Sequence, residues 1–272
     1  MVVQHNLTAM NANRQLGVAA KLQGKSTQKL SSGFRINSAA DDAAGLSISE
    51  KMRSQIRGLT QASRNAQDGI SMAQTAEGAL SEVSDMLQRM NELAIQASSG
   101  TLTSDDKDAI QSEVNALVTE MDRVAGATTF NEKKLLDGNL DVNIMVGATA
   151  DASNKINLTI GNMAGSELLK DGISSGKFDI TDAAAVTTIT GAIKAVSSQR
   201  SDIGAVQNRL EHTINNLDNV IENTTSAESA IRDTDMASEM VNYSKNNILM
   251  QVSQSMLAQA NAANQSVISL LQ

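Results

Sequence analysis

Few side chains in this sequence stand in a pattern that could carry chemistry. Gly24-Lys25-Ser26 resembles the end of a phosphate-binding loop, but the first glycine of that motif would stand at position 19, which is alanine. Neither His5 nor His212 has a histidine or glutamate four residues on, the helical spacing of zinc ligands. No Gly-x-Ser-x-Gly motif is present. We therefore expect no enzyme activity, no catalytic residue, no metal and no cofactor.

Two pairs of adjacent carboxylates are better explained by helix starts and turns than by acid–base catalysis. Asp105 and Asp106 follow Thr103, which can accept a hydrogen bond from the third helical amide, while Asp106 stands where the reciprocal carboxylate of a capping box belongs. Asp41 and Asp42 precede Ala-Ala-Gly-Leu and fit a turn or a cap. Both pairs are expected to be structural.

The composition excludes several classes of protein. The 272 residues include no proline, cysteine or tryptophan, and aromatic residues make up 1 % although hydrophobic residues make up 41 %. Without cysteine there is no disulfide framework or thiolate site, and a chain of aliphatic residues without helix breakers predicts long packed helices. Residues 1–40 carry five basic and no acidic side chains, which leaves 17 basic against 30 acidic in the rest. This acidic body argues against a nucleic-acid partner.

Hydrophobic periodicity predicts several of those helices. A helix is expected from about Leu46 to Ser98, and from Leu80 onward its apolar residues recur in steps of three and four, which is coiled-coil spacing. At 1.5 Å per residue this helix would be a rod of about 80 Å. A second heptad row occupies Ile189, Val196, Ile203, Leu210 and Leu217, and a last helix is expected from about Thr234 to the end.

The middle of the chain, between Gly126 and Gly191, has a different pattern. Residues 142–146 and 156–160 alternate between apolar and polar side chains, which predicts a β-hairpin, and Phe178 with Ile180 suggests a further short strand. The predicted fold is therefore mainly α, an elongated antiparallel coiled-coil rod with a small β-hairpin insert and with paired N- and C-terminal helices.

The two ends of the chain lack partners of their own. An apolar row occupies Val241, Ile248, Val252 and Met256. No charged side chain follows Lys245, and the polar side chains after it are Gln, Asn and Ser. An isolated helix with such a face exposed would be poorly stable. We expect this segment to be disordered alone and buried in an assembly, with the N-terminal stretch as its natural partner. No apolar run is long enough for a secretory signal or a membrane span, so no membrane insertion is expected.

Several segments resemble bacterial flagellin. The most specific is Leu30–Ser49, whose sequence LSSGFRINSAADDAAGLSIS is similar to the N-terminal motif of that family. The resemblance covers about residues 1–140 and 190–272 and includes the segments Gln4–Ala9, Thr129–Gly138, Asn208–His212, Ser226–Asp235 and Gln254–Asn261 and the closing Leu-Leu-Gln.

This resemblance implies a subunit of the flagellar filament that is exported uncleaved and unfolded through the flagellar type III system. Residues 1–44 and 228–272 would form the inner core, and residues 45–227 the rod domain, with a β-rich insert at about 128–188 and no large outer domain. Partners would be other copies of the chain, an export chaperone, the filament cap and hook–filament junction proteins. The expected assembly core consists of Leu7, Met10, Leu30, Val241, Ile248, Val252, Met256, Val267, Leu270 and Leu271.

The resemblance also implies a contact with the host Toll-like receptor 5. The family motif corresponds to Gln88–Leu93, where Arg89, Glu92 and Leu93 match, and Glu113 matches on the neighbouring helix. Asn91 stands where strongly recognised members carry a basic residue. An ordinary exposed helix face explains the same residues. Two alternatives to a filament subunit remain at this stage: a hook–filament junction protein and a secreted coiled-coil binding module.

Overall fold

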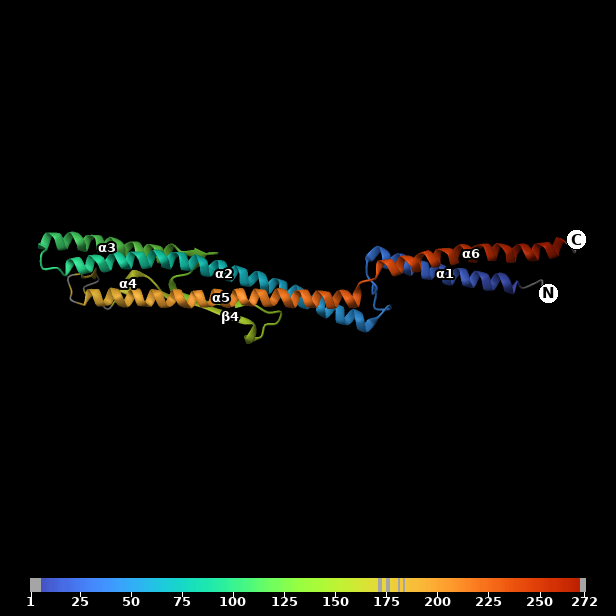
Figure 1. Ribbon diagram of the computed structural model, residues 1–272, viewed down its shortest axis with the longest axis horizontal. Helices are drawn as coiled ribbons and strands as arrows, with labels where there is room; N and C mark the ends of the chain where they lie inside the picture. Colours follow the sequence, from blue (N-terminus) through green and yellow to red (C-terminus); the bar gives the residue numbers. More distant parts are fainter. Residues whose placement is uncertain (1–5, 171–172, 175–176, 181, 183, 270–272) are drawn as a thin grey trace. The chain divides into compact units, whose positions relative to one another are not determined.

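The computed structural model describes residues 6–170, 173–174, 177–180, 182 and 184–269, and it is mainly helical. The helices are α1 (Leu7–Ser32), α2 (Ala43–Ala97), α3 (Ser104–Ala127), the short α4 (Gly165–Leu168), α5 (Ala185–Arg232) and α6 (Met236–Ser269) (Figure 1). The chain divides into two compact units. We call residues 1–54 with 223–272 the terminal unit and residues 55–222 the central unit.

The ends of the helices follow from local hydrogen bonds. Asp42 accepts from the amide of Gly45 at 2.9 Å, so it caps the start of α2. Thr103 and Asp106 form the predicted capping box at the start of α3, which is confirmed. Gly33 ends α1 in the left-handed conformation, with φ of 75°. With no proline in the chain, α2 runs unbroken for 55 residues.

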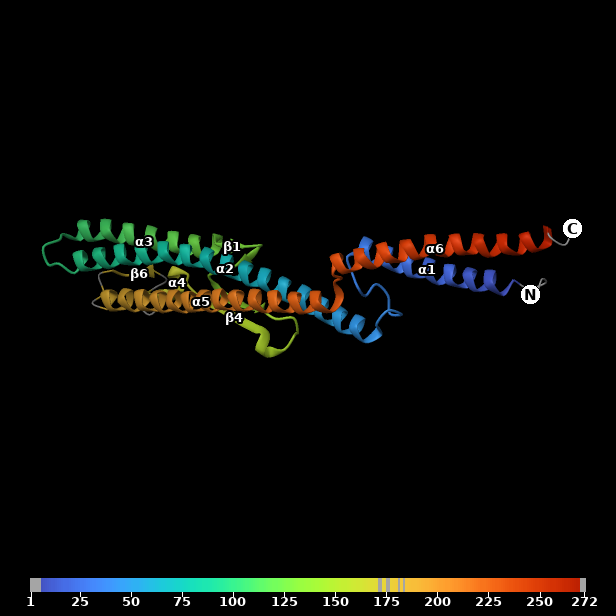
Figure 2. The same ribbon diagram turned by 45° about the vertical axis from the view of Figure 1, so that its right-hand side comes forward.

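The core of the central unit forms between α2, α3 and α5, which lie side by side in two views (Figures 1 and 2). The predicted apolar rows of α2 and α5 are confirmed, because the α2 row from Leu80 onward and Ile189, Val196, Ile203 and Leu210 of α5 are buried in one cluster. The last member of the α5 row, Leu217, is buried in a second, smaller cluster with Leu59 and Ala62 of α2. Helix α3 contributes a further row at helical spacing. The buried members of these three rows are Leu80, Val83, Leu87, Met90, Ala94, Ala97, Ile110, Val114, Met121, Ile189, Val196, Ile203 and Leu210.

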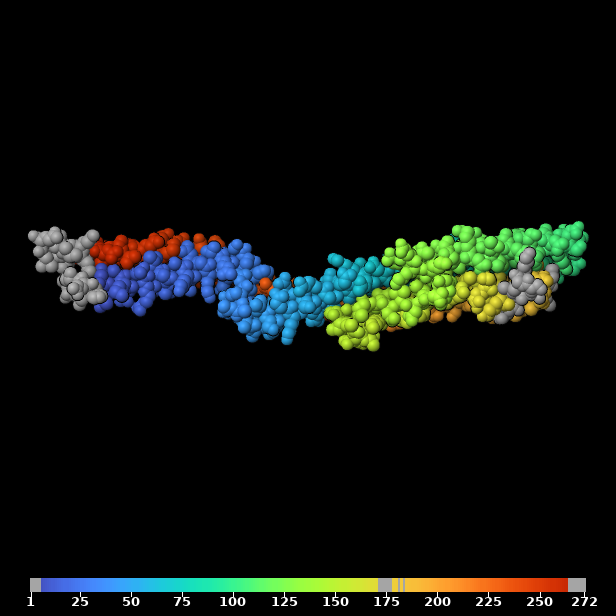
Figure 3. Space-filling model, turned by 180° about the vertical axis from the view of Figure 1, so that it is seen from behind, coloured from blue at the N-terminus to red at the C-terminus, as the bar shows by residue number. Residues whose placement is uncertain are grey.

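The predicted β-hairpin is also confirmed. Strands β3 (Asp137–Met145) and β4 (Lys155–Asn162) pair antiparallel with Val142 opposite Leu158, and the short turn η1 (Ala152–Asn154) lies between them. Two smaller pairs join β1 (Thr129–Phe130) to β2 (Lys133–Lys134) and β5 (Ile173–Ser174) to β6 (Lys177–Phe178). The further strand stops at Phe178, so Ile180, although buried, lies in a turn. Seen from behind, this insert covers much of α5 (Figure 3).

The terminal unit consists mainly of α1 and α6, which pack antiparallel. Near one end of the pair Asn6 donates to the carbonyl of Ala260 at 2.9 Å, and near the other Lys29 lies 3.8 Å from a carboxylate oxygen of Glu239. Two connectors, residues 33–42 and 233–235, lead from these helices to α2 and α5. The pairing of the N- and C-terminal helices is therefore as predicted.

Candidate assembly surface

Helices α1 and α6 meet along two rows that mix small, polar and larger apolar residues, which we call the α1–α6 seam. Along each helix the seam residues recur in steps of three and four, as in a coiled coil, and are buried or half-buried. Its members are Ala9, Ala12, Leu16, Ala19, Gln23, Ser26 and Leu30 on α1 and Glu239, Tyr243, Asn246, Met250, Ser253, Leu257 and Ala260 on α6.

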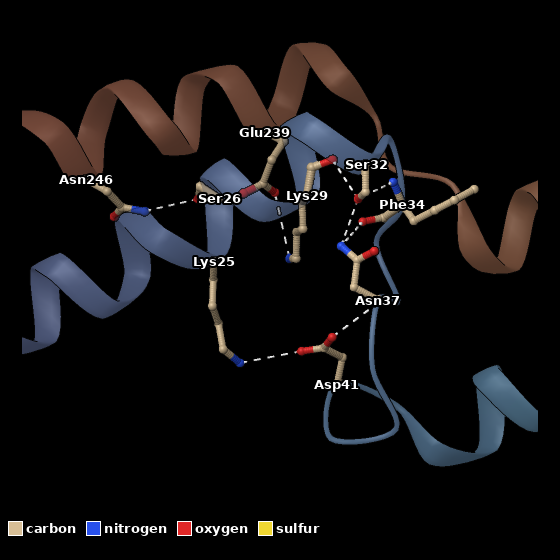
Figure 4. A network of polar contacts seen from close by, with 9 residues as sticks. All are labelled: Lys25, Ser26, Lys29, Ser32, Phe34, Asn37, Asp41, Glu239 and Asn246. Carbon is tan, nitrogen blue, oxygen red and sulfur yellow. Dashed lines mark hydrogen bonds and ion pairs between the residues drawn. The ribbon is translucent and has the colours of Figure 1, made fainter.

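The seam is held by polar contacts as well as by packing (Figure 4). Asn246 donates to the Ser26 hydroxyl at 3.3 Å, and the ammonium of Lys29 pairs with Glu239. Ser26 and Glu239 are both buried. Polar groups at such positions fix the register of paired helices at a cost in stability, because a slipped register would leave them buried without partners. The seam is therefore specific in register but weak for its length.

Many large apolar side chains of α1 and α6 lie away from this seam. Leu7 and Met10 on α1 are 63 % and 62 % exposed, and Val241 on α6 is 69 % exposed. Isolated surface apolar residues are ordinary, but rows of them along paired helices indicate an interaction site. The remaining exposed members of these two stripes are Val18 and Leu22 on α1 and Ile248, Val252 and Met256 on α6.

The C-terminal segment has the N-terminal helix as its partner, as expected, but the sequence did not show which face of α6 makes the contact. The row of Tyr243, Met250 and Leu257 packs on α1, and the row that begins at Val241 does not. The contact row of α1 is rich in alanine and serine, which lets the larger residues of α6 approach closely. The stripe of α6 therefore remains available to another partner.

The other residues expected in the assembly core are placed as follows. Leu30 is half-buried within the seam, unlike the exposed Leu7 and Met10. Val267 lies within α6, but its side chain is not among those that the structure describes. Leu270 and Leu271 lie outside the described residues.

The connector between α1 and α2 is organised by Asp41 (Figure 4). Its carboxylate accepts from the hydroxyl and the amide of Ser38, both at 3.0 Å, and lies 3.6 Å from the ammonium of Lys25. The hydrogen bonds from Ser38 lower the pKa of Asp41, and Lys25 adds a smaller effect in the same direction. Asp41 and Asp42 thus have the turn and cap roles expected of them.

The residues matched to the receptor motif form an exposed ion-pair cluster in the central unit. Arg89 donates from two nitrogens to Glu113 at 2.9 and 3.0 Å and from a third to Glu92 at 3.2 Å. These hydrogen bonds, led by those to Glu113, raise the pKa of Arg89. Leu93 is 2 % exposed and belongs to the core. Only the three charged residues therefore share a surface.

Neither a metal site nor a membrane span is found in the part of the chain that the structure describes. No three His, Cys, Asp or Glu side chains among those residues are placed to hold an ion. Likewise, none of the described helices combines the length and apolar character needed to cross a membrane. What the described surface offers is exposed apolar rows on paired helices.

Sequence reasoning missed two features of the terminal unit. The seam residues Ser26, Asn246 and Glu239 are polar, so hydrophobic periodicity could not identify them. The second feature is Arg232, whose guanidinium lies 4.5 Å from the ring centroid of Phe34. The only feature of the sequence that pointed to this contact was the rarity of its partner, because the chain has three phenylalanines.

Long helices, paired terminal helices and exposed apolar rows are typical of a helical structural protein. Comparisons with known proteins identify its family. The model of the bacterial flagellin N-terminal helical region matches residues 3–141, and that of the C-terminal helical region matches residues 186–271. The chain belongs to the bacterial flagellin family.

Individual relatives agree over the full length. A flagellin from Halalkalibacterium halodurans is 52 % identical over 276 residues, which cover 100 % of both chains. A flagellar filament core protein from Treponema maltophilum is 46 % identical over 286 residues, again covering 100 % of both. A solved structure from Vibrio parahaemolyticus, described as a flagellar hook-associated protein, has a TM-score of 0.57 at 15 % identity and covers 71 % of this chain and 100 % of that one. At that identity the last match concerns the fold alone.

Proposed function

We propose that this flagellin is a structural subunit that polymerises into the flagellar filament used for swimming, with the exposed stripes of α1 and α6 as its main assembly contacts. The observation that carries the proposal is the exposure of Leu7, Met10, Val241 and Ile248 on helices that are already paired through their other faces. Burying such stripes against other copies supplies about 25 cal/mol per Å² of apolar surface. The chain therefore acts by association and not by catalysis.

The terminal and central units take different roles in this proposal. Residues 1–44 with 228–272 would form the inner core of the filament, and residues 45–227 the rod domain. Export of the unfolded, uncleaved chain through the flagellar type III system accords with a chain that has no cysteine to oxidise on the way. An export chaperone, the filament cap and the hook–filament junction proteins would be its transient or terminal partners.

Arg89, Glu92 and Glu113 form the surface that a host Toll-like receptor 5 would meet. Their side chains are 51 %, 70 % and 45 % exposed, so they are accessible in the single chain. Leu93 would contribute only by supporting this face from beneath, because it is buried.

The assembly surface is tested by placing a charge on the α6 stripe. In the variant Val252→Asp the carboxylate would have to be buried between subunits, so filament formation should fall by at least about tenfold. The matched control is Gln254→Asp, which adds the same charge at an exposed position off the stripe and should polymerise normally. Electron microscopy and sedimentation measure the polymer, and circular dichroism checks that both variants keep their helices. Normal filaments from Val252→Asp would refute the assignment.

A further inference from the structure

Arg232 joins four segments of the terminal unit. Its guanidinium donates to the Glu50 carboxylate at 3.1 Å and to the Ser49 hydroxyl at 3.4 Å, both on α2, and lies over the ring of Phe34 in the first connector. Arg232 itself ends α5, directly before the second connector. The Arg232 side chain is 12 % exposed, whereas the Glu50 side chain is 51 % exposed, so the clasp is shielded from water on the arginine side and open to it at Glu50.

The backbone beside Arg232 ties the two connectors to each other. The amide of Arg35 donates to the Arg232 carbonyl at 2.7 Å, and the amide of Thr234 donates to the Gly33 carbonyl at 3.0 Å. Phe34 and Asp233 thereby form an isolated antiparallel β-bridge. The connectors that lead into α1 and α6 are thus joined at one point.

The neighbouring residues reinforce this point. Ser49 donates to Glu228 at 2.8 Å, and the Arg35 side chain donates to the carbonyl of Ile231. We call Phe34, Ser49, Glu50 and Arg232, with the bridge between the connectors, the Arg232 clasp. Both hydrogen bonds come from one guanidinium nitrogen, so a lysine ammonium could replace them, but it could not stack a planar group on Phe34. Lysine should therefore replace the arginine only in part.

We propose that Arg232 is a positioning residue for assembly: its clasp holds the two connectors together, so that the C-terminal end of α1 and the N-terminal end of α6 are neighbours in the register that their seam requires. A two-bond bridge between connectors is too short to be stable alone. The seam fixes one register but is weak, so α1 and α6 must already be aligned when they come together. This inference rests on the proposed function, because it assigns a residue that presents the assembly stripes.

The clasp can be tested without any polymer by amide hydrogen exchange of the full-length chain. The amides of Arg35 and Thr234 report on the bridge directly. In Arg232→Ala they should exchange at least about tenfold faster than in the wild type. The control is Arg53→Ala, which removes another arginine from the same Glu50 carboxylate, at 3.3 Å, without touching the bridge. Unchanged exchange in Arg232→Ala, or equal acceleration in Arg53→Ala, would overturn the clasp.

Copolymerisation with excess wild-type chain tests the consequence for assembly. Arg232→Ala should enter filaments at least about tenfold less than Arg53→Ala, and Arg232→Lys should fall between them. Equal incorporation of the alanine variants would overturn the positioning role. If Arg232→Ala loses helix content, amide exchange of Arg232→Lys tests the clasp in its place. Faster exchange of the Arg35 and Thr234 amides alone would support the clasp, and faster exchange throughout the chain would refute it. Wild-type chains that form no filament would refute the proposed function, while the exchange measurement would still decide the clasp.

Discussion

Single polar side chains fix where the helices of this flagellin begin. At the start of α3 the Thr103 hydroxyl accepts from the Asp106 amide at 3.3 Å, and the Asp106 carboxylate accepts from the Thr103 amide at 3.0 Å. The carboxylate also accepts from the Thr103 hydroxyl at 2.7 Å. These bonds, led by that from the hydroxyl, lower the pKa of Asp106 below its ordinary value of 3.8. The stability that this cap gives to α3 therefore depends on pH.

Thr103→Ala should lower the free energy of unfolding of the central unit by about 1 kcal/mol at pH 7, because the cap is lost. A carboxyl with a lowered pKa contributes stability above its ordinary pKa, and that contribution disappears as the pH falls through the folded value. The difference between wild type and Thr103→Ala should therefore shrink as the pH falls below the ordinary carboxyl pKa of 3.8. Urea unfolding at each pH measures this.

The control for this cap is Ser112→Ala, on the exposed face of the same helix. Its hydroxyl donates only to the carbonyl of Asp108 within the helix, at 3.0 Å. This variant should change little at either pH. A difference for Thr103→Ala that stays constant from pH 5 to the acid range would exclude the coupling to Asp106.

At the scale of elements, the sequence pattern predicted the helices and strands that carry a continuous apolar row. The heptads of Val196, Ile203 and Leu210 and the alternation in β3 and β4 were sufficient to find α5 and the hairpin. These elements bury their apolar face within the same chain, so periodicity and packing agree.

The pairing face of α6 could not be found in this way. The helix has a conspicuous apolar row at Val241 and Ile248 and an inconspicuous mixed row at Tyr243 and Asn246. Periodicity identifies the first row but cannot tell whether it faces the same chain or another one. That choice depends on the small residues of α1 and on the polar contacts across the seam, which are properties of a pair of helices.

The hairpin depends on a glycine at its bulge. Gly138 has φ of +81°, and a Cβ there would lie 2.7–3.1 Å from atoms of Asn162, including its backbone. Gly138→Ala should therefore cost about 1–3 kcal/mol of unfolding free energy, through strain and collision together. Gly78→Ala is the control, since Gly78 lies inside α2 with nothing within 4 Å of a new Cβ. That variant should stabilise by up to about 1 kcal/mol, through helix propensity. Urea unfolding followed by circular dichroism compares the two variants, and an equal effect of both would contradict the role of the bulge.

At the scale of the whole molecule, the two units differ in how much apolar surface they bury. The central unit has a continuous cluster that runs from α2 and α3 into the β insert and α5. In the described part of the terminal unit, the fully buried apolar residues are Ala19, Ile36 and Ala260. Because hydrophobic burial is the main favourable term in folding, the terminal unit should open at a lower free energy than the central unit.

The single tyrosine makes this difference measurable, since Tyr243 lies in the α1–α6 seam and the chain has no tryptophan. Tyrosine fluorescence of the unpolymerised chain should change at a lower urea concentration than the main loss of helical circular dichroism. Leu87→Ala, a fully buried position of the central unit, should cost about 2–5 kcal/mol and move only the second transition. Coincident transitions that move together in Leu87→Ala would show one cooperative unit and contradict this account. Separate transitions would mean that the stripes are carried by the less stable part of the subunit, so that association in the filament stabilises that part by mass action.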